Sequence, residues 1–507
     1  MTRRIIPIPS VSTYRALAVG ILIGLVSLLI PLLRDLHWES AGLSSLVIAF
    51  YGGMRSANTK TSLRFVRDGL GLCLGWFLPL WVFALWTNCF SFDGLAYWVL
   101  GPLPSLLFGG VVGRLCRSFQ FTCTRFITFI VLTAVAIVPT LIEFLSFPQL
   151  YFFNHVWSYW PGPIYDEIVH FDSRLIAYRS LTFFWILVLW SLPAFFKNTI
   201  SKWILLLGVT AIMFTYLNAS AWGLILSEER LKNHLGAQYE TEHFLISYPP
   251  GIFDPSKRVQ IGEQHESYLT EIFDILKLDK DYYRQNKIHS YLYADNEQKK
   301  RLTGAGQTSF VPVWLEQDQT HISFNSYKRV LKHELVHILA KRFGNWFGAS
   351  NSIGLVEGLA VALAPERYPS SIDPLVAART EWPDHEEIKK LFSPAGFYQT
   401  AGPISYLISG SFVRHLIKHY PVDLFKRAYR TADLESAYHP LTLENLVHTW
   451  HVHLDTVNID PEDRRRSASL FNTPSILEKP CPRVVKQREL QALIHYPLAE
   501  PRFIACK

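Results

Sequence analysis

Hydrophobic and polar positions are distributed unevenly along the 507 residues of the chain. Up to Leu226, long apolar runs are separated by short polar stretches, whereas the pattern from Ser227 onwards has the short periods of a water-soluble fold. A membrane-spanning helix needs about 20 mostly apolar residues. We therefore predict an all-α membrane region, 1–226, with about seven spans: 16–33, 40–54, 69–90, 95–113, 126–146, 177–196 and 201–222. The second is short and ends in Gly52 and Gly53, so a re-entrant or tilted segment is the alternative there.

Charge divides the chain at the same place. Of the 49 Lys and Arg and the 42 Asp and Glu, 15 and 8 precede Ser227, so the remainder carries 34 of each. The formal charge of +7 therefore belongs to the apolar part. A balanced second part argues against a nucleic-acid partner.

The basic residues of the first part fall in alternate loops, as they do when cytoplasmic loops carry the excess of Lys and Arg. The richer set of loops holds Arg3, Arg4, Arg15, Arg55, Lys60, Arg64, Arg67, Arg114, Arg117, Arg125, Lys197 and Lys202. The opposite set holds only Arg34, Arg174 and Arg179. This asymmetry places the N-terminus in the cytoplasm and, after seven crossings, the second part outside it. The expected location is a bacterial inner membrane, with a periplasmic or extracellular domain.

The second part predicts two lobes and a tail. Residues 227–326 have strand composition at 242–249, 287–295 and 319–324 and helical spacing at 263–277, which indicates an α+β lobe with a mixed or antiparallel sheet. Residues 327–463 read as helical, with further helices at 352–364, 383–392, 401–419, 421–431 and 441–456. The tail, 464–507, has little periodicity.

The stretch "LKHELVHILAKRFG" at 331–344 carries the chemistry. On a helix, His333 and His337 lie one turn apart on the same face and can bind one metal ion, while Glu334 points toward water held there. A catalytic zinc site has three protein ligands and one open position. The helix predicted at 327–342 also carries Lys328, Arg329, Lys332, Lys341 and Arg342, which excludes it from a bilayer.

A third ligand is available in "GLVEGLAVALAPE", where Glu357 follows His337 by 20 residues. An acid in the middle of an apolar helix needs a partner, because an unpaired buried carboxylate costs several kcal/mol. Zinc is such a partner. Gly358 is expected to let this helix approach the one that carries the histidines.

"HELVH", 19 intervening residues and "EG" resemble the gluzincin branch of zinc metallopeptidases, which includes thermolysin, over about 240–456. The resemblance is to a peptidase MA-like domain. It implies that His333, His337 and Glu357 bind Zn²⁺ and that Glu334 is the general base. It also implies an oxyanion-stabilising tyrosine from 396–421, with Tyr406 first and Tyr398 second, and a substrate-pairing edge strand at 319–324.

The resemblance has a gap and leaves alternatives. The "GxMEN" motif of large aminopeptidases is missing, so the expected activity on a peptide or protein substrate is endopeptidase or oligopeptidase. A non-catalytic, zinc-stabilised sensor or binding module coupled to the membrane region is the alternative, although a structural site would not need Glu334. Hydrolysis of a non-peptide amide would use the same residues.

Other histidines and two cysteines have simpler interpretations. The pair His415 and His419 repeats the four-residue spacing without an intervening glutamate, and solvated or core-edge residues are expected there rather than a second metal site. The same interpretation covers His448, His451 and His453. In an oxidising compartment Cys481 and Cys506 can form a disulfide, with two free thiols as the alternative.

The predicted topology can be tested with protease. Protease added to intact spheroplasts is expected to digest the domain that begins at Ser227, because the loop asymmetry places this domain outside the cytoplasm. Immunoblotting of the domain measures the loss, and inverted vesicles provide the control. Protection in spheroplasts with digestion in inverted vesicles would contradict the seven-span topology.

Overall fold

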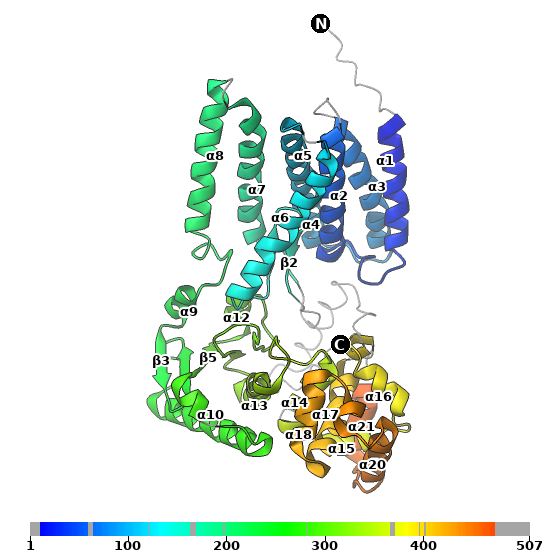
Figure 1. Ribbon diagram of the computed structural model, residues 1–507, viewed down its shortest axis with the longest axis vertical. Coiled ribbons are helices and arrows are strands. Elements are labelled where there is room, and N and C mark those ends of the chain that lie inside the picture. Colours follow the sequence, from blue (N-terminus) through cyan, green and yellow to red (C-terminus); the bar gives the residue numbers. More distant parts are fainter. Residues whose placement is uncertain are drawn as a thin grey trace. The chain divides into compact units, whose positions relative to one another are not determined.

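The computed structural model describes residues 11–58, 64–120, 122–162, 169–195, 198–279, 281–365, 371–394, 396–399 and 402–471. Its described residues form two compact units, which meet in sequence between Ser227 and Glu228. The first unit is mostly helical, and the second combines a small sheet with many helices (Figure 1). The boundary lies within one residue of the change in polarity along the sequence.

Each span predicted in the first unit overlaps a helix, but the first helix ends at Ser27 instead of residue 33, and the span predicted at 95–113 is divided at Gly101. Eight α-helices are described in this unit. They are α1 (Val11–Ser27), α2 (Trp38–Asn58), α3 (Arg64–Trp86), α4 (Phe92–Leu100), α5 (Pro102–Ser118), α6 (Thr124–Ser146), α7 (Arg174–Ser191) and α8 (Thr199–Leu217). Among the described residues, five segments are long and apolar enough to cross a membrane: Arg64–Trp86, Phe92–Ser118, Thr124–Ser146, Arg174–Ala194 and Thr199–Leu217. α1, with 17 residues, is apolar but shorter.

Helix α2 packs in a way that explains why its sequence is less apolar than the five candidate spans. It is one continuous helix of 21 residues rather than a segment that ends at Gly53. Its buried positions are mostly small residues such as Ser44 and Ser45, and a side chain at Gly109 of α5 would overlap the carbonyl of Ala49. Small residues let helix backbones approach closely in membrane proteins, at the expense of hydropathy.

A short hairpin and a buried arginine in this unit were not predicted. Strands β1 (Phe152–Asn154) and β2 (Ser158–Trp160) form an antiparallel hairpin. Arg179, expected in a loop, lies buried in α7 and donates to the carbonyls of Gly101, Asn154 and His155. Without Arg179, the poorer set of loops has still fewer basic residues than the sequence suggested.

The second unit contains a mixed four-stranded sheet. Its strands are β3 (Ala237–Glu240), β4 (Phe244–Tyr248), β5 (Ile288–Tyr293) and β6 (Gln319–Ser323), in that spatial order. β3 pairs antiparallel with β4, and the other two pairings are parallel. Parallel neighbouring strands need a crossover connection. The connections here are helical: α10 (Pro255–Leu276) and α11 (Asp281–Gln285) precede β5, and α12 (Asn296–Thr303) precedes β6. The last three strands coincide with the three predicted ones.

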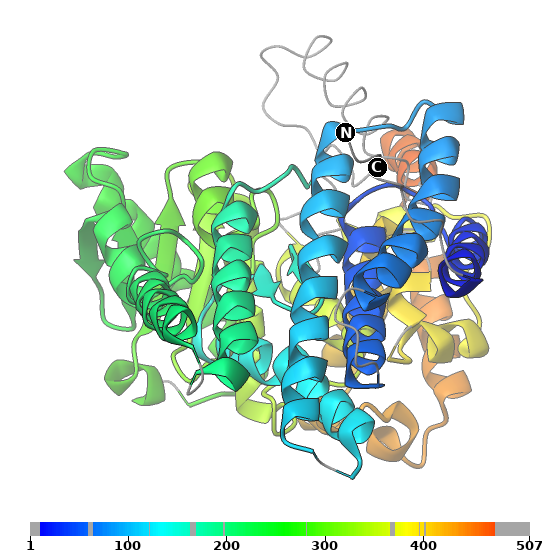
Figure 2. The same ribbon diagram turned by 90° about the horizontal axis from the view of Figure 1, so that it is seen from above.

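Helices make up the rest of the second unit. They are α9 (Glu228–Leu235), α13 (Tyr327–Ala340), α14 (Ile353–Leu363), α15 (Ile372–Ala377), α16 (His385–Leu391), α17 (Gly402–His419), α18 (Val422–Thr431), α19 (Leu434–Tyr438), α20 (Leu443–Asp455) and α21 (Pro461–Phe471), with short 3₁₀ helices η2 (Lys341–Phe343) and η4 (Gly396–Gln399). Figure 2 shows the sheet and α10, in green, on the opposite side of this unit from the helices drawn in yellow and orange. α13 contacts β6, α10 and α14 and so joins the two sides.

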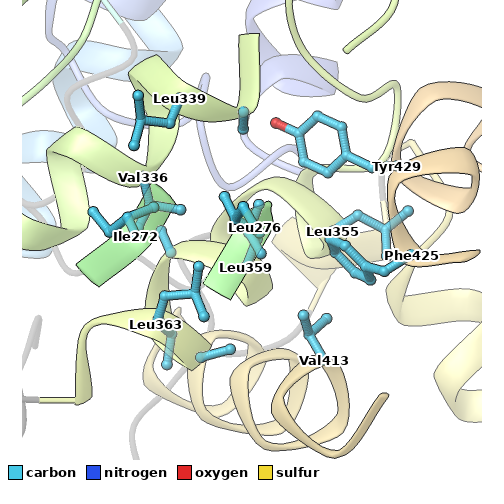
Figure 3. Close-up of a cluster of buried hydrophobic side chains, with 14 of the residues drawn as sticks. Ile272, Leu276, Val336, Leu339, Leu355, Leu359, Leu363, Val413, Phe425 and Tyr429 are labelled. Atoms are coloured by element: carbon cyan, nitrogen blue, oxygen red, sulfur yellow. The ribbon is translucent and has the colours of Figure 1, made fainter. Parts of the chain in front are cut away.

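One apolar core holds these helices together (Figure 3). It contains fully buried side chains from five helices: Ile272 and Leu276 of α10, Leu339 of α13, Leu355 and Leu359 of α14, Val413 of α17, and Phe425 of α18. Each such side chain contributes about 1.5–3 kcal/mol when it leaves water. The positions of α13 and α14 are therefore set by packing on three other helices.

Two expectations need correction, and a third concerns residues outside the described ranges. The tail was expected to begin at residue 464, but α21 continues to Phe471, and Ser467 donates to the carbonyl of Leu375. Gly358 faces α17, not α13: a Cβ there would lie 2.9 Å from the carbonyl oxygen of Ser409. Cys481 and Cys506 lie outside the described residues. Cys73, Cys116 and Cys123 are free thiols, whereas Cys89 is disulfide-bonded.

The contact between α14 and α17 can be tested with a double-mutant cycle. A Cβ at Gly410 would overlap the side chain of Val361, so Gly410→Ala should cost about 1–3 kcal/mol through overpacking, offset by about 1 kcal/mol of helix propensity. Val361→Ala leaves a cavity that the new methyl group can fill. The double variant should be more stable than the sum of the single effects by about 1 kcal/mol. Thermal unfolding of the full chain in detergent measures this coupling, and strictly additive effects would contradict the contact.

Candidate metal centre

Helix α13 presents two imidazoles side by side. The rings of His333 and His337 have centroids 4.9 Å apart and are nearly perpendicular. The neighbouring cation Lys332 is buried and paired with Glu271 of α10 at 2.6 Å. Just beyond the helix, Lys341 pairs with Asp318 at 2.7 Å. These pairs hold the helix on both sides of the two histidines and satisfy two of the five charges expected to keep it out of a bilayer.

Helix α14 supplies the carboxylate. Ser352 caps its first turn by accepting a hydrogen bond from the backbone N–H of Leu355, and Glu357 follows one turn later. One oxygen of Glu357, Oε2, lies 3.3 Å from Nε2 of His333 and 3.7 Å from Nε2 of His337. The three residues predicted as ligands are therefore together, with their ligand atoms within 4.8 Å of one another.

These distances suit a tetrahedral ion. Zn²⁺ binds imidazole nitrogen and carboxylate oxygen at about 2.0–2.2 Å, which gives ligand-to-ligand edges of about 3.3–3.6 Å in a tetrahedron. The donor set of two neutral imidazoles and one carboxylate also matches Zn²⁺ in charge and softness. The 3.3 Å between Oε2 of Glu357 and Nε2 of His333 is also within hydrogen-bonding distance, whereas the 3.7 Å to His337 is longer than a hydrogen bond.

Burial differs among the four residues of the motif. His333 is 2% exposed and Glu334 is 4% exposed, whereas the side chains of His337 and Glu357 are 11% and 20% exposed. The site therefore opens to solvent on the side of His337 and Glu357. Glu334 is shielded from water, so its interactions with other charges are screened less than they would be at the surface.

The two predicted tyrosines differ in their relation to this site. Tyr398, in η4, is 37% exposed, and burial together with the negative charge of Glu357 raises its pKa. Tyr406, in α17, is half-buried and packs edge-on against Phe397 at 5.0 Å. Of the two predicted tyrosines, Tyr398, the second choice, is the one whose pKa is raised by the charge of Glu357.

A third tyrosine was missed by sequence reasoning. Burial and the charge of Glu357 raise the pKa of Tyr429, and a hydrogen bond with the Ser350 backbone opposes this shift. Tyr429 is 1% exposed and belongs to the apolar core, so it cannot meet a substrate. Nothing in the sequence pattern pointed to it, because it lies 72 residues after Glu357 and is brought there only by helix packing.

Strand β6 lies at the edge of the sheet directly before α13, as expected. Its outer side is partly occupied, however. Phe310 forms an antiparallel bridge with His321, in which the N–H of His321 donates to the Phe310 carbonyl at 3.0 Å. A peptide could pair with the middle of β6 only if the segment around Phe310 moved aside.

The structure also gathers three histidines that sequence reasoning treated separately. His415 and His419 of α17 meet His453 of α20, and their ligand nitrogens lie within 4.8 Å of one another. His448 is exposed elsewhere on α20, and His451 bonds the carbonyl of Pro383. The structure therefore brings three of these five histidines together, which the sequence pattern did not indicate.

Comparison with known proteins adds no assignment. No protein-family model and no curated protein matches this chain.

Loss of the carboxylate ligand should weaken metal binding. Glu357→Gln removes the negative charge but keeps the size of the side chain, so zinc affinity should fall at least about 10-fold, the lower limit for disturbing even an outer partner of a metal site. Zinc content and competition with a chromophoric chelator measure the change. Glu435→Gln, at an exposed position of α19, is the matched control and should leave zinc binding unchanged. Equal affinity of both variants would exclude Glu357 as a ligand.

Proposed function

We propose that this chain is a membrane-anchored zinc metallopeptidase that hydrolyses peptide bonds on the non-cytoplasmic side of the membrane. The observation that carries the proposal is the convergence of His333, His337 and Glu357 from two helices, with one carboxylate oxygen 3.3 and 3.7 Å from two imidazole nitrogens. A structural role for these residues alone would not call for Glu334 beside them. The resemblance of the motif to gluzincins supports the same conclusion.

The proposed anchor has seven crossings. α1 and α2 join the five segments that meet the length and apolarity of a span. An odd number of crossings, together with the loop asymmetry, puts the second unit outside the cytoplasm. The inner membrane of a bacterium fits this arrangement, with the second unit in the periplasm or outside the cell.

Each residue of the site has a role in the proposed hydrolysis. A zinc ion held by the three ligands would polarise the scissile carbonyl and lower the pKa of its water. Glu334 accepts the proton of the attacking water and passes it to the leaving amine. A tyrosine hydroxyl donates a hydrogen bond to the oxyanion. Tyr406 is the sequence-based choice, and the charge interaction with Glu357 favours Tyr398.

The substrate is proposed to be a peptide or protein. An extended peptide lying along β6 would be recognised through its backbone rather than through its side chains. Because Phe310 occupies the middle of that edge, binding includes displacement of this bridge. Aminopeptidase specificity is not supported, because the GxMEN motif is missing.

The test separates an enzyme from a zinc-stabilised module. In Glu334→Gln the side chain keeps its size but no longer accepts a proton, while all three ligands remain. We expect normal zinc content and unfolding temperature, with hydrolysis of membrane-proximal or periplasmic peptides reduced about 100-fold or more.

The readout is a comparison of cleaved peptides in cells that carry the wild-type protein or the variant, alongside complementation of a deletion. Glu435→Gln again serves as the control. Full complementation by Glu334→Gln together with failure of Glu357→Gln would show that zinc supports a structure, and the peptidase proposal would be abandoned.

A further inference from the structure

Two histidines near the C-terminal end of α17 and one from α20 form a cluster separate from the HELVH site. His415 and His419 are one helical turn apart, and His453 reaches them from α20. The ring centroids lie 4.5–5.9 Å apart, and the ligand nitrogens lie within 4.8 Å of one another. His415 is buried, His453 is intermediate and His419 is exposed, so the cluster opens to solvent on one side.

The hydrogen bond of His415 sets the state of its ring. Thr449 donates its hydroxyl proton to the carbonyl of Leu446 at 2.9 Å, so its oxygen is an acceptor toward His415 Nε2, 3.2 Å away. His415 Nε2 therefore carries a proton, which leaves Nδ1 with a lone pair when the ring is neutral. Nδ1 is buried and has no hydrogen-bond partner among the described residues. A buried acceptor of this kind costs about 1–3 kcal/mol unless something binds it.

His453 has a similar support on its far side. Its Nε2 lies 3.4 Å from Oδ2 of Asp373, and a carboxylate only accepts, so Nε2–H points to Asp373 and Nδ1 has the lone pair when the ring is neutral. A carboxylate behind the imidazole is the usual outer partner of a metal-binding histidine. Asp373 is itself held, because Ser411 donates to its Oδ1 at 2.9 Å.

The scaffold around the cluster is rigid. Trp450 of α20 is fully buried and donates from its indole N–H to Ser411 of α17 at 3.0 Å. Its ring also packs edge-on against Phe412 at 5.4 Å. The two helices that supply the histidines are therefore locked together next to the cluster, which is the preorganisation that a metal site needs.

We infer that His415, His419 and His453 form a second metal site, which binds a divalent transition-metal ion through three imidazoles. Three neutral nitrogen ligands within 4.8 Å of one another suit Zn²⁺ or Co²⁺ in type, with the fourth position open to solvent beside His419. Hard cations such as Mg²⁺ and Ca²⁺ prefer oxygen ligands and are excluded. An ion here would tie α17 to α20 and stabilise the helical lobe in proportion to its binding free energy.

The experiment uses the full chain in detergent, purified through a tag that contains no histidine. In the His333→Ala/His337→Ala variant only the second site remains, and titration of the metal-free protein with Co²⁺ should give one bound equivalent with the absorption of a tetrahedral nitrogen site. Adding His419→Ala should abolish this equivalent, because His419 is exposed and its loss should leave the fold intact. Adding His448→Ala, an exposed histidine on the same α20, should leave it unchanged.

A second measurement covers the case in which the variant at the first site does not fold. In the otherwise unchanged protein, His419→Ala should lower the zinc content by one equivalent per chain and reduce the stabilisation by added Zn²⁺ in thermal unfolding. Unchanged content and stabilisation would overturn the inference, as would binding that survives loss of both His419 and His453. Neither result depends on peptidase activity, so this inference can fail while the proposed function stands, and the reverse also holds.

Discussion

The packing of α13 against α14 is the constraint on which the candidate metal centre depends. Four-residue spacing brings His333 and His337 together within one helix, but the position of Glu357 relative to them is decided by how two helices meet. Leu339 on one side and Leu355 and Leu359 on the other are fully buried in the same core. Since interiors are close-packed, a shift of either helix would open a cavity or force an overlap. The 3.3 Å between His333 and Glu357 is therefore held by apolar side chains that have no chemical role themselves.

The part of the site that was predictable is the part that is local. His333 and His337 follow from helical periodicity, and Glu357 follows from the cost of an acid in an apolar helix. Short polar elements were missed because they lack an apolar period: α12 depends on its cap, in which Asp295 accepts from the backbone N–H of Gln298. Long-range features were missed for another reason. The contact of Gly358 with α17, the charge effect of Glu357 on Tyr429 and the position of His453 beside His415 all depend on which helices become neighbours, and the sequence pattern does not carry that information.

Helix α17 connects several of these features. Near its start, Ser405 donates to the carbonyl of Phe397 at 2.7 Å and so fixes η4, which carries Tyr398. In its middle, Ser409 contacts Gly358, the residue after Glu357. At its end lie His415 and His419. The distance from Tyr406 to His415 along the axis is only about 14 Å, at about 1.5 Å per residue. A change in the position of this one helix would reach the tyrosines, the carboxylate ligand and the histidine cluster together.

The placement of Glu334 bears most directly on whether the centre is catalytic. Helix α13 is buried over most of its length, and the fold would be served at this position by a small apolar residue, because a carboxylate that is 4% exposed pays a desolvation cost of several kcal/mol before any partner offsets it. Metal binding does not explain this cost, since the three ligands are supplied by other residues. Neither does packing, because the neighbouring positions Leu335 and Val336 already fill the core. In the proposed peptidase, a buried acid directly after His333 would serve proton transfer, for which low exposure to water is an advantage.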